Sequence, residues 1–476
     1  LEGMAPIECI HHEDRRVTVD GRIALLLPTP PRFTAGSTGA KGDVVATVQA
    51  GSAVSEPLGW LHDEARMAQA AFLYPLAHTA TVRVAIPVDQ SRPSRLRIRG
   101  PADVARSWQA QTGRGMQLDL PPGGLADAVE ANRRFLLMFQ EDVVALDHYG
   151  FHDEAVEVLG RQPVDDGAAV WRLAEHWRLT GDIDLVRAMV PKVAIAAQAI
   201  ERRRQRKRRR CVPAERGLLG SSYAVNFWAL GGLKASAVLL DAAGEEHAAA
   251  TAARWAHGFK RDLDASLAVV ADHLGPDALV ACTPLHLYRA TDPAITESVE
   301  AITRLCRIGG AIFPTFPESV LRLAAVQLEA GDHQALEWLA RLLDVASPTW
   351  TWSGGAGDGH DAVVGAMFCS FVRDLLVRET PGGLALCTML PHDWPGQSIE
   401  VHHATTHAGT LSFAVRWHGL RPALLWELRP HRPAESITLT APGLDPQWQS
   451  DKPAGEALLG PLAPPAVRPD AADRLR

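Results

Sequence analysis

The sequence predicts a mainly α-helical protein with flanking β domains, in which a closed (α/α)6 toroid of paired helices forms the centre. Over residues 121–394, apolar side chains recur with helical spacing in roughly ten to twelve segments. Runs rich in Val, Ile and Leu precede and follow this region, as is typical of strands. This number of helices is too large for a four-helix bundle, and the segments lack the fixed sequence period of a solenoid. The pattern therefore favours a toroid.

The N-terminal region, residues 1–120, is predicted to form a β-sandwich-like domain. The runs "RIALLLP", "DVVATVQA" and "ATVRVAIPV" are expected to be strands, because Pro and Gly clusters separate them as in an antiparallel sheet. The stretch "LHDEARMAQAAFL" is expected to add a short helix to this domain.

In the central region, short turns are expected to join the helices in pairs. Gly181-Asp182 and Gly331-Asp332 each combine a residue that ends one helix with a residue that caps the next. Strands are expected to return over residues 395–446, with "SIEVHHA", "GTLSFAVRWHG", "PALLWELRP" and "SITLTAP" forming a small C-terminal β domain. Residues 447–476 are rich in Pro, Ala and Asp and are predicted to be a flexible tail.

The composition is that of an ordinary globular protein, with 47% hydrophobic and 22% charged residues in a chain of 476. A net charge of −7 argues against a nucleic-acid partner. The basic run over residues 202–210 is therefore interpreted as an exposed helix end and loop. None of the six cysteines forms a C-x-x-C pair, and free thiols suit a reducing cytoplasm.

Several classes of site have no signature in this sequence. No phosphate-binding loop, dinucleotide fingerprint or trusted metal-ligand spacing is present, so neither a cofactor nor a metal is predicted. The first thirty residues lack a secretory pattern, and no window of about 18 residues is judged apolar enough to span a bilayer. The prediction is a cytoplasmic protein without a membrane partner, and its oligomeric state is left open.

A glycine-rich stretch before the last central helix is the first candidate site. Trp350 and Trp352 could offer flat surfaces to a sugar ring, with Asp358 and His360 beside them. Glycines around Asp358 would let the backbone approach a ligand closely. The alternative is that Asp358 or Asp361 only caps the following helix. We expect a rim loop with Trp352 facing the opening.

Other candidates also lie where helices are expected to begin. Asp165 and Asp166 precede one helix, and one of them is expected to be its N-cap while the other projects toward the opening. Glu318 is either a first-turn acid favoured by the helix dipole or a catalytic base. Because all these starts belong to paired helices of alternating direction, we expect the segments near residues 165, 223, 318 and 355 to converge at one end of the toroid.

An aromatic and polar cluster opens a further central helix. Asn226 could either cap this helix or bond a sugar hydroxyl. Tyr223 and Trp228 could contact the same sugar, although the apolar spacing after Trp228 also suits a core position.

The domain order and several stretches resemble the bacterial six-hairpin glycosidases, a clan that includes glucoamylase-like enzymes. The stretches are "NRRFLLMF", "DDGAAVWRLAEHWRLTGD", "YAVNFWALGGLKAS", "GAGDGHDA" and "GTLSFAVRWHGLRPALLWEL". The resemblance implies an inverting glycoside hydrolase acting on an α-glucan or other oligosaccharide or polysaccharide. It also implies a general acid at Asp165 or Asp166, with Asp358 and Glu318 as further catalytic candidates.

The chain departs from that family at positions where similar proteins carry acids. A Trp-x-Arg-Asp-Ala stretch is missing from the first hairpin, and Val225 precedes Asn226 where an acidic residue is common. Ser353 and Gly354 follow Trp352 where similar proteins have Pro-Glu. Glycosidase activity could therefore be impaired by shortened loops, and the alternative is a non-catalytic carbohydrate-binding or scaffolding protein.

Overall fold

The structure is a computed structural model. It describes residues 6–87, 100–164, 166–208, 218–219, 222–269, 274–307, 317–353, 360–431 and 437–462. The chain divides into two compact units, Leu1–Ser107 and Trp108–Arg476, and each is described by itself. Both helices and sheets are present, so the predicted mixed class with a large helical share is confirmed.

The first unit is built on a four-stranded antiparallel sheet. Its strand order is β3 (Arg22–Leu26), β2 (Arg16–Val19), β1 (Cys9–Glu13) and β5 (Gly59–His62), and β4 (Phe33–Ser37) pairs separately with β6 (Gln69–Leu73). One face of the sheet buries Ile10, Val17, Leu27 and Ala68. The helix expected in "LHDEARMAQAAFL" is wrong, because strands β5 and β6 occupy its two ends.

Helix α1 (Val44–Gln49) replaces a strand expected in "DVVATVQA". The Asp43 side chain accepts a hydrogen bond from the Val45 backbone N–H at 2.9 Å, and this N-cap starts the helix. The β-branched residues that suggested a strand lie in this short helix. We attribute the helical conformation to the Asp43 cap.

The second unit contains a succession of helices that the sequence periodicity predicted in large part. Within the described residues they are α3 (Gly124–Phe139), α4 (Val143–His148), α5 (His152–Arg161), α6 (Gly167–Thr180), α7 (Ile183–Arg208), α8 (Tyr223–Ala242), α9 (Glu246–Leu267), α10 (Asp277–Cys282), α11 (Pro293–Arg307), α12 (Pro317–Glu329), α13 (Gln334–Asp344) and α14 (Ala362–Leu376). Helix α2 (Pro101–Thr112) precedes them, in a region expected to contain only strands and one other helix.

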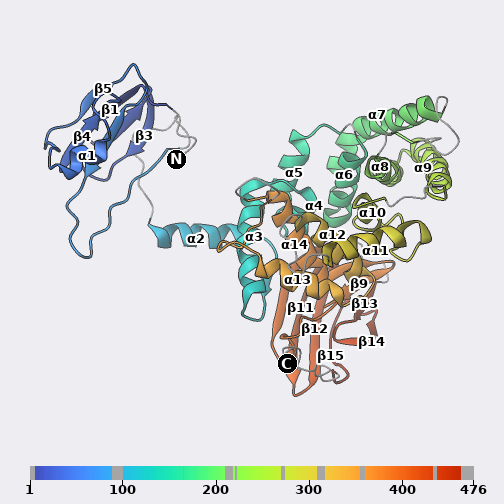
Figure 1. The fold of residues 1–476 in the computed structure, drawn as a ribbon. Coiled ribbons are helices and arrows are strands. Elements are labelled where there is room, and N and C mark those ends of the chain that lie inside the picture. Colours follow the sequence, from blue (N-terminus) through green and yellow to red (C-terminus); the bar gives the residue numbers. More distant parts are fainter. Residues whose placement is uncertain are drawn as a thin grey trace, which may run out of the picture. The chain divides into compact units, whose positions relative to one another are not determined.

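Alternate helices close a ring (Figure 1). In the described part of the chain, α4, α6, α8, α10, α12 and α14 contact one another in that order, and α14 returns to contact α4. The intervening helices α5, α7, α9, α11 and α13 contact members of this ring, and α3 packs on α14. Because every second helix belongs to the ring, ring helices share one direction and place their N-termini at one end.

Two glycines let neighbouring ring helices α6 and α8 approach closely. A Cβ atom added at Gly167 would lie 2.1 Å from the Trp228 carbonyl oxygen, and one added at Gly232 would lie 2.3 Å from the Gly167 Cα. No side chain fits there, so the start of α6 packs directly on the backbone of the first half of α8.

Two sheets follow the ring in the same unit (Figure 1). One has the order β15 (Ala454–Leu458), β12 (Arg421–Pro430), β11 (Gly409–His418), β10 (Ile399–Thr406) and β7 (Gln117–Asp119). The other has the order β14 (Asp445–Ser450), β13 (Thr438–Ala441), β9 (Gly383–Leu386) and β8 (Val377–Thr380). The strands expected over residues 395–446 are thus present as β10 to β13.

The domain limits differ from the expected ones at both ends. Strand β7 lies within the region expected to be N-terminal, yet it pairs with β10 of the C-terminal sheet. Strands β14 and β15 lie almost wholly in the segment expected to be a flexible tail, and β15 pairs with β12 over residues 454–458. Residues 463–476 lie outside the described part.

Helix α8 corrects one further expectation. Tyr223–Ala242 is long and apolar enough to cross a membrane by length and composition, contrary to the sequence prediction, and 61% of its apolar window is buried among the other helices. In the described part of the basic run, Arg202, Arg203 and Arg206 are exposed at the end of α7 as expected. Arg204 is the exception, since it is 3% exposed and pairs with Glu201 and Asp262.

Candidate functional site

A cavity of about 680 Å³ opens where several ring helices end. Its wall includes His148 from the last position of α4, Arg178 from the last turn of α6, Glu329 from the end of α12 and Asp374 from the last turn of α14. The segment after α10, strand β8 and the turn between β10 and β11 complete the wall. The cavity therefore lies toward the C-terminal ends of the ring helices and against the second unit's own sheets.

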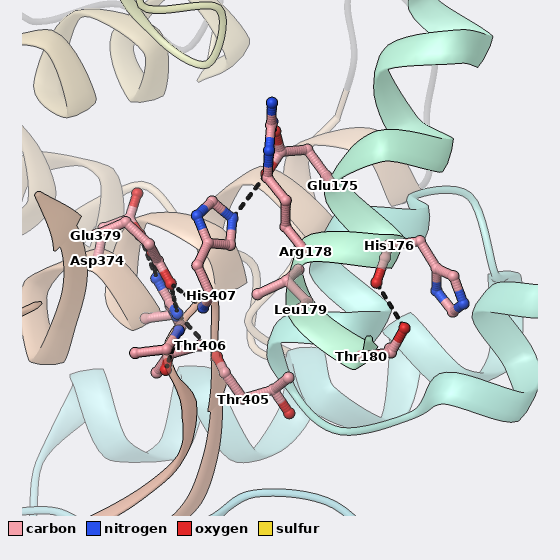
Figure 2. A network of polar contacts seen from close by, with 12 residues as sticks. Glu175, His176, Arg178, Leu179, Thr180, Asp374, Glu379, Thr405, Thr406 and His407 are labelled. Atoms are coloured by element: carbon pink, nitrogen blue, oxygen red, sulfur yellow. Dashed lines mark hydrogen bonds and ion pairs between the residues drawn. The ribbon is translucent and has the colours of Figure 1, made fainter. Parts of the chain in front are cut away.

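Glu175 and His407 join the helical ring to the β10–β11 turn (Figure 2). The His407 Nε2 lies 2.9 Å from Glu175 Oε2, and Arg178 forms an ion pair with the same carboxylate. Burial alone would raise the pKa of Glu175, but the His407 hydrogen bond and the charges of Arg178 and His407 outweigh it and lower the pKa. Glu175 is thus ionised and held in place at neutral pH.

Arg373 organises a second pair of carboxylates at the cavity wall. Its side chain is fully buried, and its NH2 nitrogen donates to Glu379 Oε1 at 2.6 Å and to the Thr405 carbonyl oxygen at 2.8 Å. Its NH1 nitrogen also donates to Glu379 and lies 3.3 Å from Asp374 Oδ1. Figure 2 shows His407 between this group and the Glu175–Arg178 pair.

Asp374 and Glu379 share Arg373 but titrate in opposite directions. Burial raises the pKa of Asp374 to about 6, and the nearby Arg373 offsets only part of that rise. Burial would also raise the pKa of Glu379, but its bidentate contact with Arg373 outweighs burial and holds the pKa well below the ordinary value. The Asp374 side chain keeps 26% of its surface exposed and lines the cavity, so its proton can reach a ligand.

Glu329 faces the cavity from the end of α12. Its Oε2 accepts a hydrogen bond from the Thr283 hydroxyl at 3.0 Å, and its Oε1 lies 3.3 Å from His286 Nδ1. Burial tends to raise the pKa of Glu329, but the His286 and Thr283 hydrogen bonds lower it overall. With 36% of its side chain exposed, Glu329 is an ionised carboxylate that a bound water or hydroxyl can reach.

Two aromatic side chains complete the wall. Trp171 packs edge-on against Trp228, with ring centroids 5.4 Å apart. Tyr288 donates to Asp264 Oδ1 at 2.7 Å, and the Lys260 ammonium lies 4.1 Å from the centre of its ring. The arrangement combines one carboxyl that is protonated near pH 6, ionised carboxylates and flat apolar surfaces, which is a combination suited to acid–base chemistry on a polyhydroxylated ligand.

Asp166 and Glu318, two of the four acids predicted from the sequence, lie at the opposite, N-terminal ends of the ring helices and are engaged there. Asp166 is the N-cap of α6, and its Oδ1 accepts from the Ala169 N–H at 2.8 Å. Glu318, the second residue of α12, forms an ion pair with Arg322 at 2.8 Å. Asp165 and Asp358 lie outside the described residues. Asp361 caps α14 by accepting from the Val363 and Val364 N–H groups, as the alternative interpretation held.

The polar and aromatic candidates at the start of α8 mostly serve the fold. Asn226 is fully buried, and it accepts from the Leu219 N–H at 2.7 Å and donates to the Ser222 carbonyl oxygen at 2.9 Å. Because its side chain is fully buried and makes these two bonds, Asn226 holds the start of α8 and does not face a ligand. Tyr223 bonds the Ser266 hydroxyl at 2.7 Å, whereas Trp228 packs edge-on against Trp171, which lines the cavity. None of these three is among the described residues that line the cavity.

The tryptophans before α14 separate into two environments. Trp352 is 3% exposed, donates to the Leu342 carbonyl oxygen at 2.9 Å and packs on Phe368, so the expectation that it faces an opening is wrong. Trp350 is half-buried with φ +59° and borders a hollow on the surface of α3. His360 lies edge-on against Phe135 at 4.4 Å, and burial lowers its pKa.

The sequence analysis missed the residues that line the cavity, although a signal for them exists. Arg373 and Asp374 interrupt the apolar pattern of α14, and both lie on a helix that is otherwise buried. Trp171, Glu175 and Arg178 recur at i, i+4 and i+7 and so share one face of α6. Charged residues on a helix face that points inward are costly unless they are paired or functional.

Comparison with known proteins gives a limited result. No protein-family model matches the chain, and no curated protein matches it. Among 11 matching chains of solved structures is a crystal structure of native α-L-rhamnosidase from Aspergillus terreus, with a TM-score of 0.49 and 11% identity. The match covers 96% of this chain and 64% of that one, so this chain spans less than two thirds of that structure's length.

Proposed function

We propose that the chain is a carbohydrate-active protein and that it hydrolyses a glycosidic bond in the cavity at the C-terminal ends of the ring helices. The observation that carries the proposal is the set of carboxyl groups on one wall, with Asp374 poised to give a proton and Glu329 ionised. Glycoside hydrolysis uses such a pair, one carboxyl to protonate the leaving oxygen and one to activate water or attack carbon. The resemblance to six-hairpin glycosidases and the closed ring of helix contacts support the same class.

In this proposal each residue has one role. Asp374 is the general acid, because it reaches the cavity and its pKa of about 6 lets it carry a proton at mildly acidic pH. Glu329 is the base, held by His286 and Thr283. Trp171 supplies an apolar surface for the sugar ring. Inversion of configuration, an oligosaccharide substrate and a cytoplasmic location remain parts of the proposal that come from the sequence alone.

A reducing-end assay with a panel of oligosaccharides tests the proposal through three variants. We expect Asp374→Asn and Glu329→Gln each to lower turnover by about 10²–10⁴-fold, the usual cost of losing a general acid or base. Glu318→Gln is the matched control, because it removes a carboxylate at the other end of α12 that forms an ion pair with Arg322 and does not line the cavity.

The outcomes separate the competing hypotheses. Loss of activity in Glu318→Gln with activity retained in Asp374→Asn would move the site to the N-terminal ends of the ring helices. Calorimetric binding of oligosaccharides without any turnover would favour the non-catalytic carbohydrate-binding alternative. An absence of both binding and turnover across the panel would remove carbohydrate from the proposal.

A further inference from the structure

Arg378 lies on strand β8 and lines the cavity, and its guanidinium makes no ion pair with any described residue. It is half-buried, its Nε is buried without a hydrogen-bond partner, and no described carboxylate forms an ion pair with it. The buried Arg204 and Arg373 also have unpartnered Nε atoms, but their terminal nitrogens bond carboxylates. Arg378 has no such bond at either kind of nitrogen in the described part of the chain.

The carboxylates around Arg378 are committed to other partners. Glu175 is held by His407 and Arg178, Glu379 by Arg373, and Glu329 by His286 and Thr283. The charge of Arg378 tends to lower the pKa of Glu329 and of Asp374, so it acts on both, but no described carboxylate forms an ion pair with its guanidinium. Partial burial of a guanidinium without an ion-pair partner lowers the stability of the fold. An anionic ligand that bonds the guanidinium offsets this cost and is therefore bound more tightly.

A guanidinium matches a carboxylate in shape as well as in charge. Its planar fork can donate two parallel hydrogen bonds to the two oxygens, whereas a sugar hydroxyl accepts one and adds no charge. The same cavity offers Trp171 and Tyr288 as apolar surfaces for the ring that would carry the carboxylate. A sugar acid could therefore satisfy both features of the wall at once.

We infer that the cavity selects an oligosaccharide that carries a uronic acid, whose carboxylate pairs with Arg378. This inference rests on the proposed function and narrows its substrate from oligosaccharides in general to acidic ones. Arg378 is a specificity-determining residue here, and the acid and base remain Asp374 and Glu329. The carboxylates on the same wall should in turn weaken binding of an anion unless Arg378 is present to offset them.

The test is calorimetric titration of the full chain at pH 7 with two sugars of identical linkage, α-1,4-digalacturonate and α-1,4-galactobiose. We expect the acidic sugar to bind about 10- to 100-fold more tightly than the neutral one, as one charge-assisted bidentate contact provides. In Arg378→Gln the preference should fall to about twofold or less while galactobiose affinity stays unchanged. Arg378→Lys should keep part of the preference, since it keeps the charge but not the fork.

Arg416→Gln is the control, because Arg416 is an exposed arginine on β11 that pairs with Glu400 and does not line the cavity. It should retain the wild-type preference. Should Arg378→Gln fail to fold in a thermal melt, salt titration of the wild-type protein gives a second measurement. The preference of the wild-type protein for digalacturonate over galactobiose should fall several-fold between about 0.05 and 0.5 M salt. Salt screens the attraction between Arg378 and the sugar carboxylate, because this pair is partly exposed.

Equal affinity of the wild-type protein for both sugars would overturn the inference and leave the proposed function standing. If Arg378→Gln still prefers digalacturonate, the inference is also overturned, because another cation must then bind the sugar carboxylate. If neither sugar binds, this inference is overturned, and the proposed function is then decided by the oligosaccharide panel. Tighter binding of galactobiose than of digalacturonate would also overturn the inference, because the cavity would then disfavour the carboxylate.

Discussion

Replacement of Arg373 by methionine should destabilise the second unit more than any surface change. The guanidinium is fully buried and bonds both oxygens of Glu379 and the carbonyl oxygen of Thr405. Methionine fills a similar volume but leaves the Glu379 carboxylate without its cation. Breaking a buried pair by removing one partner costs about 3–5 kcal/mol, so we expect a loss of free energy of unfolding of about that size.

Urea unfolding followed by tryptophan fluorescence measures this loss. Twelve of the 13 tryptophans lie after residue 107, with Trp60 the exception, so the signal reports the second unit. Arg429→Met is the control, because Arg429 pairs with Glu427 on the surface and 71% of its side chain is exposed. It should change stability by no more than about 0.5 kcal/mol. A loss below about 1 kcal/mol in Arg373→Met would refute the reasoning.

A double variant and the pH dependence test whether the unpaired Glu379 carboxylate causes the loss of stability in Arg373→Met. Arg373→Met combined with Glu379→Leu removes both charges, so it should recover a large part of the stability. The pKa of Glu379 is lowered in the folded state, so its contribution is present above its unfolded value of 4.5 and is lost as pH falls through the lower folded value. The loss in Arg373→Met should therefore be nearly constant between about pH 6 and 8.

Three further predictions concern pH, a helix cap and a close contact between helices. Hydrolysis should decline as pH rises through about 6, because Asp374 then loses its proton, and a pH–rate profile without that decline would contradict its role as the acid. The same raised pKa gives a stability contribution that is present below 3.8 and lost as pH rises to about 6. Asp361→Ala removes the α14 cap and should cost about 0.5–2 kcal/mol in a urea melt, with oligosaccharide affinity unchanged. Gly232→Ala should cost about 1–3 kcal/mol, because its Cβ would meet the Gly167 backbone, and an unchanged melt would show that α6 and α8 can separate freely.

Periodicity gave most of the central helices because their burial follows one face. Helix α14 was predicted as the last central helix and runs over Ala362–Leu376, with Asp361 as its cap. The failures have local causes that periodicity does not contain. Asp43 turned a β-branched run into helix α1, and β15 has the sequence AGEAL, whose strand conformation comes from backbone pairing with β12.

The candidate site was harder to predict for a related reason. Helix starts carry recognisable cap residues, so the sequence drew attention to Asp166 and Asp361, and the structure uses both as caps. Trp352 was expected at an opening because glycines follow it, yet its indole is held in the core by Leu342 and Phe368. The cavity residue Glu175 gains its environment from His407 in the β10–β11 turn, which lies 232 residues away in the sequence.

The polar chemistry of the ring follows from the direction of its helices. Several ring helices end at the cavity, and helix C-termini present unsatisfied carbonyl groups with a partial negative charge. Such an end attracts cations, and Arg178 and His286 gather there from the end of α6 and the segment after α10. The carboxylates Glu175, Glu329 and Glu379 are stable in that negative field because these and neighbouring cations hold them. An anionic ligand meets the same field, so the gain from Arg378 must exceed it, and the preference for a uronic acid should lie toward the lower end of the 10- to 100-fold range.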